Sequence, residues 1–179
     1  MKKIFAILLA VTLLASMATV VSAAESTTTL TTTVPAATYT LNIPANQEIA
    51  FGATKTNIGN ITVADANGFA EGKDLKVALS YSPFTSAEVS TTIPYEIFPS
   101  LGLSASDSAR VPCIASGEKI TFKGNANGTV AEQASISFGN ANLDLQALLV
   151  VVNSADWGKA LGGEYTATIT FTAEVVVEQ

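Results

Sequence analysis

The stretch that most constrains the fold of this chain is its last one, residues 165–177, where apolar and polar side chains alternate. Every odd-numbered position is apolar or aromatic, and threonine or glutamate fills the even positions up to Glu174. A period of two is that of a β-strand with one buried face and one face in water. β-Branched and aromatic residues favour the same conformation. We predict a long strand whose odd-numbered side chains face the core, and such a strand requires neighbours in a sheet.

Shorter segments of the same kind recur upstream at the spacing of all-β domains. Glycine and asparagine clusters separate them, and no long stripe of helical period follows residue 23. About eight or nine strands without crossover helices predict an antiparallel Ig-like or Greek-key β-sandwich over residues 37–179, with a closed barrel as second choice. The continuous apolar run 148–152 suits the middle of a sheet. The other segments are 39–51, with an interruption at Pro44-Ala45-Asn46 between 39–43 and 49–51, and then 61–63, 75–81, 93–97, 111–115, 119–123 and 130–138.

The first 23 residues have the composition of a secretory signal peptide. A basic start, Lys2–Lys3, precedes an almost unbroken apolar run from Ile4 to Val21, and small residues lead on to Ala23. This order predicts export with cleavage after Ala23. A retained membrane anchor is the competing interpretation, because the run is nearly long enough to span a bilayer. We therefore expect a protein that is secreted and either extracellular or associated with the cell wall.

The next segment, residues 24–36, is rich in threonine. Three threonines precede Leu30, and three more lie between Leu30 and Val34. Such a segment buries little surface by itself, which favours a flexible leader. Threonine also favours strands, so the alternative is an arm that pairs with the sheet edge of another subunit.

The charge balance restricts the partners. Without residues 1–23 the chain has 156 residues, with seven Lys and Arg against fifteen Asp and Glu, a net charge of −8. This length suits one domain. The acidic balance argues against nucleic acid and against anionic lipid, and no membrane contact is expected after cleavage. The expected partners are a cell-wall polymer, another surface protein, or a second copy joined through strand edges.

The residue types needed for most enzyme chemistry are scarce. The chain has no histidine, which removes most zinc sites, histidine-based catalytic triads and the usual general base. Cys113 is the single cysteine, and we interpret it as a small buried residue rather than a reactive thiol. Two carboxylates could serve a glycosidase, but no acid pair stands in a recognisable motif. We predict no enzyme and no cofactor.

One cluster of oxygen-bearing side chains resembles a metal-binding loop: Asp65, Asn67, Glu71 and Asp74. Calcium prefers several hard oxygen ligands, which such a cluster can supply. The spacing does not match the full twelve-residue loop pattern. A solvated turn is the favoured interpretation, and no bound metal is predicted.

Two aromatic residues are the candidate contacts for a ligand or partner. Trp157 lies in the loop expected before the final strand, where an exposed indole could stack on a sugar or dock on a partner. The favoured interpretation is structural, with Trp157 capping the end of the core close to Tyr165. Phe98 is the second candidate, provided that it is exposed near polar loops.

The segment Gly163-Glu164-Tyr165-Thr166-Ala167-Thr168-Ile169-Thr170-Phe171-Thr172 resembles the closing strand of WxL-type cell-wall domains of Gram-positive bacteria, which end in G-x-Y-x-A-x-[LI]-x-W-x-L. Phe171-Thr172-Ala173 stands where that family has its tryptophan and leucine. The resemblance implies a small surface protein associated with peptidoglycan. We predict an exported, non-catalytic structural or adhesive protein. The alternatives are an extracellular carbohydrate- or peptide-binding module and a small secreted hydrolase or inhibitor.

Overall fold

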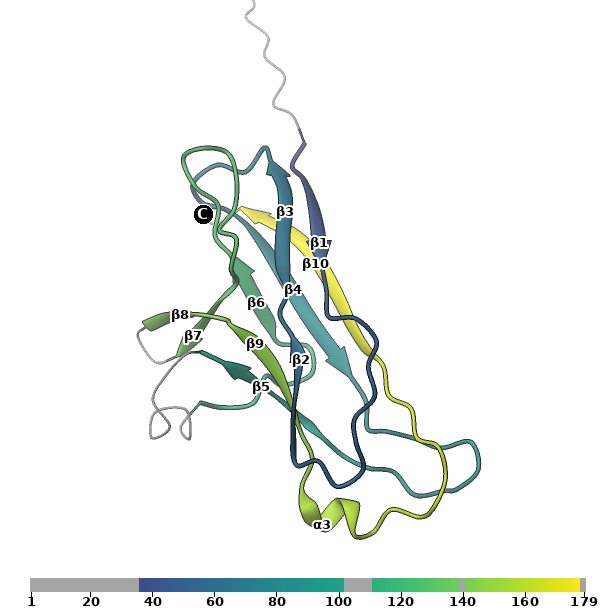
Figure 1. Cartoon of the computed structure of the whole chain (residues 1–179). Helices are drawn as coiled ribbons and strands as arrows, with labels where there is room; N and C mark the ends of the chain where they lie inside the picture. The colour runs from purple at the N-terminus through teal and green to yellow at the C-terminus, as the bar shows by residue number, and fades with distance from the viewer. Residues whose placement is uncertain (1–35, 102–110, 139–140, 178–179) are drawn as a thin grey trace, which may run out of the picture. The chain divides into compact units, whose positions relative to one another are not determined.

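The computed structural model describes residues 36–101, 111–138 and 141–177 (Figure 1). The predicted signal peptide and the threonine-rich segment up to Pro35 lie outside the described residues. The described part is nearly all β, with ten strands and one short helix, α3 (Ser154–Trp157). The strands are β1 (Thr38–Asn42), β2 (Lys55–Gly59), β3 (Thr62–Asn67), β4 (Lys73–Tyr81), β5 (Glu96–Ser100), β6 (Lys119–Phe122), β7 (Ser135–Phe138), β8 (Ala141–Asp144), β9 (Ala147–Val151) and β10 (Ile169–Val177).

The strands form three antiparallel sheets. The largest has five strands in the order β10-β4-β6-β7-β8, so β10 lies at its edge. A three-stranded sheet has the order β2-β9-β5, and β1 pairs with β3 in a two-stranded sheet. The predicted place of the apolar run 148–152 is confirmed, because β9 is the central strand of the three-stranded sheet.

Side chains from all three sheets form one cluster of buried residues. In β4 the alternation predicted for residues 75–81 is present, because Leu75, Val77 and Leu79 are fully buried. In β9, Leu148 and Val150 are buried in the same cluster. The five-stranded sheet therefore packs against the two smaller sheets, and the chain is a β-sandwich as predicted.

Some predicted strands are wrong. The segment 49–51 runs into a turn, which the Ala53 N–H to Ala50 C=O hydrogen bond of 3.0 Å closes. The segment 111–115 makes only a single bridge, from Ile114 to Ile97. β5 and β7 begin later than the segments 93–97 and 130–138 predicted. β2 and β8 were not predicted, and with them the described strands number ten rather than eight or nine.

β10 begins at Ile169, four residues later than predicted, but the predicted alternation is present from residue 165 to residue 173. Side chains at the odd positions from Tyr165 to Ala173 pack against the core cluster. The alternation fails at the end, where Val175 and Val177 are 38% and 65% exposed. Their register partners are Leu75 and Lys73. β10 therefore stays paired with β4 here, but the opposite layer of the sandwich does not cover these two side chains.

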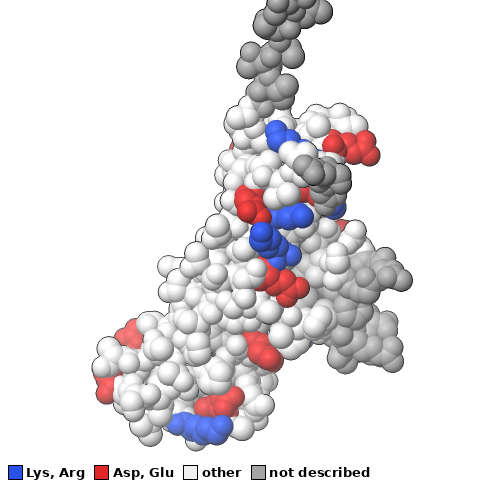
Figure 2. All heavy atoms as spheres, turned by 180° about the vertical axis from the view of Figure 1, so that it is seen from behind, with Lys and Arg blue, Asp and Glu red and all other residues white. Residues whose placement is uncertain are grey.

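Most of the surface on the face seen in Figure 2 is uncharged, and several Lys or Arg side chains there lie beside Asp or Glu. On β10, Glu174 forms an ion pair with Lys119 of β6 and lies directly opposite Lys76 in the strand register. Opposite charges across neighbouring strands stabilise a sheet by roughly 0.2–1 kcal/mol per pair. The cross-strand pairs therefore support the β10–β4–β6 register.

Candidate functional site: a groove beside the edge strand

A groove runs beside β10, between that strand and the segment that follows β1. Its inner section has a volume of about 340 Å³ and lies between residues 44–49 on one wall and residues 167–171 on the other. Ile58, Tyr95 and Val150 from the core close its floor. A wider outer section of about 890 Å³ continues toward α3 and shares five lining residues with the inner one. We call these two sections together the β10 groove.

β10 has an open edge along this groove. In the five-stranded sheet it pairs with β4 alone. Leu79 of β4 directs its N–H to Glu118 (3.1 Å) and its C=O to Gly117 (2.6 Å), on the side away from β10. Hydrogen-bonding direction alternates along an antiparallel pair, so Phe171, which is opposite Leu79, also points its backbone groups away from β4. The odd-numbered residues of β10 thus present N–H and C=O groups that meet no strand within the described part of the chain.

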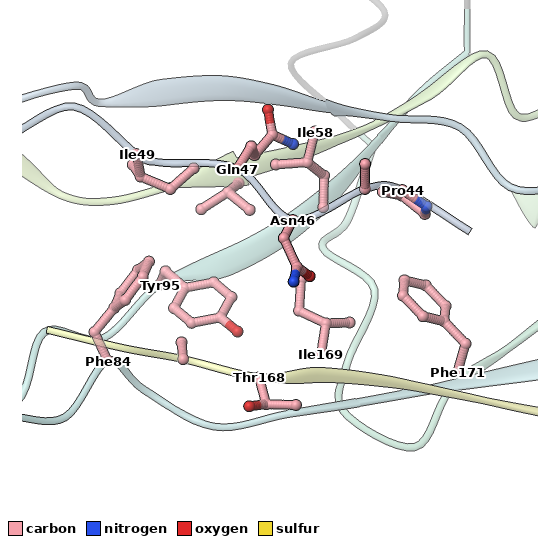
Figure 3. Close-up of a pocket in the computed structure, with 13 residues that line it drawn as sticks. Pro44, Asn46, Gln47, Ile49, Ile58, Phe84, Tyr95, Thr168, Ile169 and Phe171 are labelled. Carbon is pink, nitrogen blue, oxygen red and sulfur yellow. The ribbon is translucent and has the colours of Figure 1, made fainter.

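The floor of the groove contains a buried hydroxyl group that lacks a partner. Tyr95 is only 8% exposed, and its hydroxyl makes no hydrogen bond within the described residues. Its ring stacks on Tyr81 at 5.3 Å and contacts Phe84 at 5.0 Å. Burial, with a smaller effect of Tyr81, raises the pKa of Tyr95 to about 12. Figure 3 shows this hydroxyl pointing into the space between Asn46 and β10.

We expect the substitution Tyr95→Phe to stabilise the domain by about 1 kcal/mol, because it removes an unsatisfied buried hydroxyl and keeps the ring. Urea unfolding at neutral pH measures this.

The raised pKa of Tyr95 means that the folded state favours the neutral phenol. That contribution is present below pH 10 and is lost as pH rises toward 12, so the variant should lose less stability over this window.

Tyr81→Phe is the matched control, since the Tyr81 hydroxyl donates a hydrogen bond of 2.8 Å to the C=O of Ile114. Its loss leaves a carbonyl without that donor, and we expect destabilisation. Equal destabilisation by both substitutions would show that Tyr95 has a partner in the folded domain.

Trp157, the first predicted contact residue, lines the outer section of the groove. It ends the helix α3 rather than lying in a loop; the Asn153 side chain caps this helix by accepting the Ala155 N–H at 2.9 Å. The indole is half-buried against the core, and its Nε1 donates to the C=O of Ala53 at 2.9 Å. Phe51 meets it edge-on at 5.4 Å and is itself 81% exposed. Trp157 is therefore anchored in the domain and also forms part of the groove wall.

Phe98, the second predicted contact residue, is elsewhere. It lies on β5, opposite Leu149 of β9, and is half-buried. It lines neither section of the β10 groove. The structure does not bring Phe98 and Trp157 together.

Two of the four weak metal candidates, Asp74 and Asn67, are held by other interactions. Asp74 is buried, and its carboxylate bonds to the Lys123 Nζ at 2.6 Å and to the Gly124 N–H at 3.0 Å. Asn67 accepts the Gly68 N–H through its own side chain (2.7 Å), and Asp65 has a φ of 52° within β3, where a turn was predicted. Glu71 is exposed in the turn that precedes β4. Within residues 36–101, 111–138 and 141–177, no three His, Cys, Asp or Glu side chains are placed to share a metal ion.

Most of the groove residues carry no signal in the sequence that marks them as a site. Residues 44–46 appeared only as an interruption between two apolar segments, yet they form one of its walls. Tyr95 was predicted to be a strand residue between Ile93 and Ile97. A hydroxyl on a buried face was the available signal, but only the fold shows that it lacks a partner.

Comparison of the chain with protein-family models, with curated proteins and with solved structures finds no match. Within the described residues, no helix has the length and apolar character needed to cross a bilayer.

Proposed function

We propose that this protein is exported and acts outside the cell or on the cell wall as a non-catalytic structural or adhesive protein. The open edge of β10 beside a groove lined by apolar side chains and amides is the observation that supports this most directly. Unpaired N–H and C=O groups on an edge are a template for an added strand, and natural proteins usually cover or blunt them. The signal-peptide pattern and the resemblance to WxL-type domains agree with this proposal.

The lining of the inner section favours binding over catalysis. Its walls are formed by apolar side chains, the amides of Asn46 and Gln47, and Thr168. Tyr95 is the one titratable residue among the residues that line it, and a phenol is neutral at physiological pH. Backbone edges, amides and apolar surface recognise extended polymers by shape and hydrogen bonding.

A carbohydrate- or peptide-binding module is the second candidate, and the outer section favours it. Trp157 and the exposed Phe51 lie near the amides of Asn46 and Gln47 in that lining. Aromatic faces beside amide groups suit a sugar ring or an extended peptide. This candidate predicts that Trp157→Ala weakens binding to purified wall polymer or peptide, while Phe98→Ala, away from the groove, leaves it unchanged.

Fractionation of cells that produce the full chain tests the first candidate. We expect the protein in the medium or wall fraction, with Ala24 as its first residue by N-terminal sequencing. A cell-associated chain that retains Lys2–Lys3 would contradict cleavage after Ala23. Release of an exported protein from the wall by a denaturant would indicate non-covalent attachment.

A further inference from the structure

We propose that residues 24–35 of one copy add as a strand to the open edge of β10 in the next copy, so that copies join head to tail. The proposal deepens the structural function above and rests on its predicted cleavage after Ala23. The docking site is the β10 groove, and the occupant is the threonine-rich segment of a second molecule.

The receiving site has both elements that strand addition requires. The backbone groups of Ile169, Phe171 and Ala173 point to the open edge. Their register partners on β4 are two residues apart from one to the next, so all three direct their backbone groups the same way as Leu79, away from β10. Beside this edge, the inner section offers about 340 Å³ with an apolar floor for inward-facing side chains. Backbone pairing supplies affinity in this mode of recognition, and pockets for alternate side chains supply specificity.

The sequence of the threonine-rich segment matches this site. In an extended strand Thr28, Leu30, Thr32 and Val34 share one face, and the other face is made entirely of threonines from Thr27 to Thr33. The first face can place the two apolar side chains over the Ile169–Phe171 wall. A threonine hydroxyl on the same face can supply the hydrogen-bond partner that Tyr95 lacks.

The position of the first described residues favours a second copy as the donor. Ala36 packs against Gly68, at the end of β1 where β3 finishes. The groove wall begins with Pro44, beyond the opposite end of β1, which is about 16 Å away for five strand residues. The first described residue, Ala36, and the receiving groove are thus at opposite ends of β1. A contact between two different surfaces need not close on itself, and it then builds an open filament.

The charge of the segment permits this approach. Glu25 is its only charged side chain, so it adds little repulsion against a body of net charge −8. The inner section of the groove has no charged side chain in its lining. The segment and the groove are therefore compatible in charge as well as in shape.

The test compares chains that begin at Ala24 and at Ala37 by size exclusion with light scattering, over about a hundredfold range of concentration. The shorter chain retains every residue of the buried core. We expect the Ala24 chain to form oligomers that grow with concentration and the Ala37 chain to stay monomeric. An Ala24 chain that stays monomeric over the whole range overturns the proposal. This includes the case in which the segment binds the groove of its own molecule.

Matched variants of the Ala24 chain locate the contact. Leu30→Asp should raise the concentration needed for assembly at least about tenfold, as expected for the loss of a buried apolar side chain, whereas Thr31→Asp, on the other face, should have a smaller effect. Ala173→Pro removes an N–H that points to the open edge and spares the pairing with β4, so it should also block assembly. Oligomers that neither Leu30→Asp nor Ala173→Pro weakens overturn the proposal.

Thermal melting separates assembly from folding. Leu30 is not part of the described core, so the Leu30→Asp variant still tests the proposal if the Ala173→Pro variant fails to fold. Tyr95→Phe should have opposite effects, stabilising the Ala37 chain and weakening assembly of the Ala24 chain. Because purified Ala24 chain is used, a failure of export in cells leaves this result interpretable.

Discussion

Phe122→Ala is expected to destabilise the domain by about 3–5 kcal/mol, which corresponds to a fall of roughly 10 °C or more in melting temperature. Phe122 ends β6, in the five-stranded sheet, and is fully buried. Its register partner is Leu75 of β4, which is also fully buried. Truncation removes the ring and leaves a cavity that these neighbours cannot close. Urea unfolding of the purified protein measures the change.

Phe51→Ala is the matched control. Phe51 is 81% exposed and makes its ring contact with Trp157 at the outer section of the groove. The same truncation there should cost under about 1 kcal/mol, as for most exposed positions. Similar losses for the two variants would contradict the burial of β6 and the packing of the sheets around it.

The sequence predicts those parts of the fold in which one face of a strand is buried along its whole length. β4 is such a strand, because the buried Leu75, Val77 and Leu79 alternate with half-buried or exposed residues. β2 shows the opposite case. Its residues Lys55–Gly59 include a single buried apolar side chain, Ile58, and the strand forms because β9 supplies its hydrogen-bonding partner. Pairing between distant segments decides such strands, and local periodicity does not report it.

The apolar segments that do not form strands have an equally physical cause. Ile49 and Phe51 alternate like strand residues, but Ile49 lines the groove and Phe51 lies in a turn. No neighbouring strand pairs with them in the described structure, so their backbone follows the turn. An apolar pattern shows which side chains are suited to burial, and here one of the two is largely exposed.

The candidate site was predictable only in part. Trp157 was identified as a candidate because tryptophan before a final strand is conspicuous, and it does line the groove. The open edge of β10 depends on strand order, since at an internal position a second strand would pair with the odd-numbered residues that point away from β4. Strand order comes from the packing of all three sheets together, which no single segment encodes. The unpartnered Tyr95 hydroxyl depends on the same packing.

Gly124→Ala is expected to destabilise the domain by about 3 kcal/mol or more, because the added methyl group has no space. A Cβ at this position would lie 2.2 Å from the Lys73 carbonyl oxygen and 2.5 Å from that of Ala70. Both contacts are with backbone, so the chain itself must shift. The shift would disturb the Gly124 N–H bond to the buried Asp74 carboxylate (3.0 Å).

The same carboxylate is bonded to the Lys123 Nζ at 2.6 Å, next to Gly124 in the chain, so the collision and the loss of these polar contacts act together. Breaking the contacts of a buried carboxylate costs about 3–5 kcal/mol when its charge is left uncompensated. Gly162→Ala is the control, since a Cβ there meets nothing within 4 Å. It should leave stability unchanged or raise it by up to about 1 kcal/mol, because alanine restricts the unfolded chain. Equal melting temperatures for the two alanine variants would show that the loop around Gly124 is not held against β4 by Asp74.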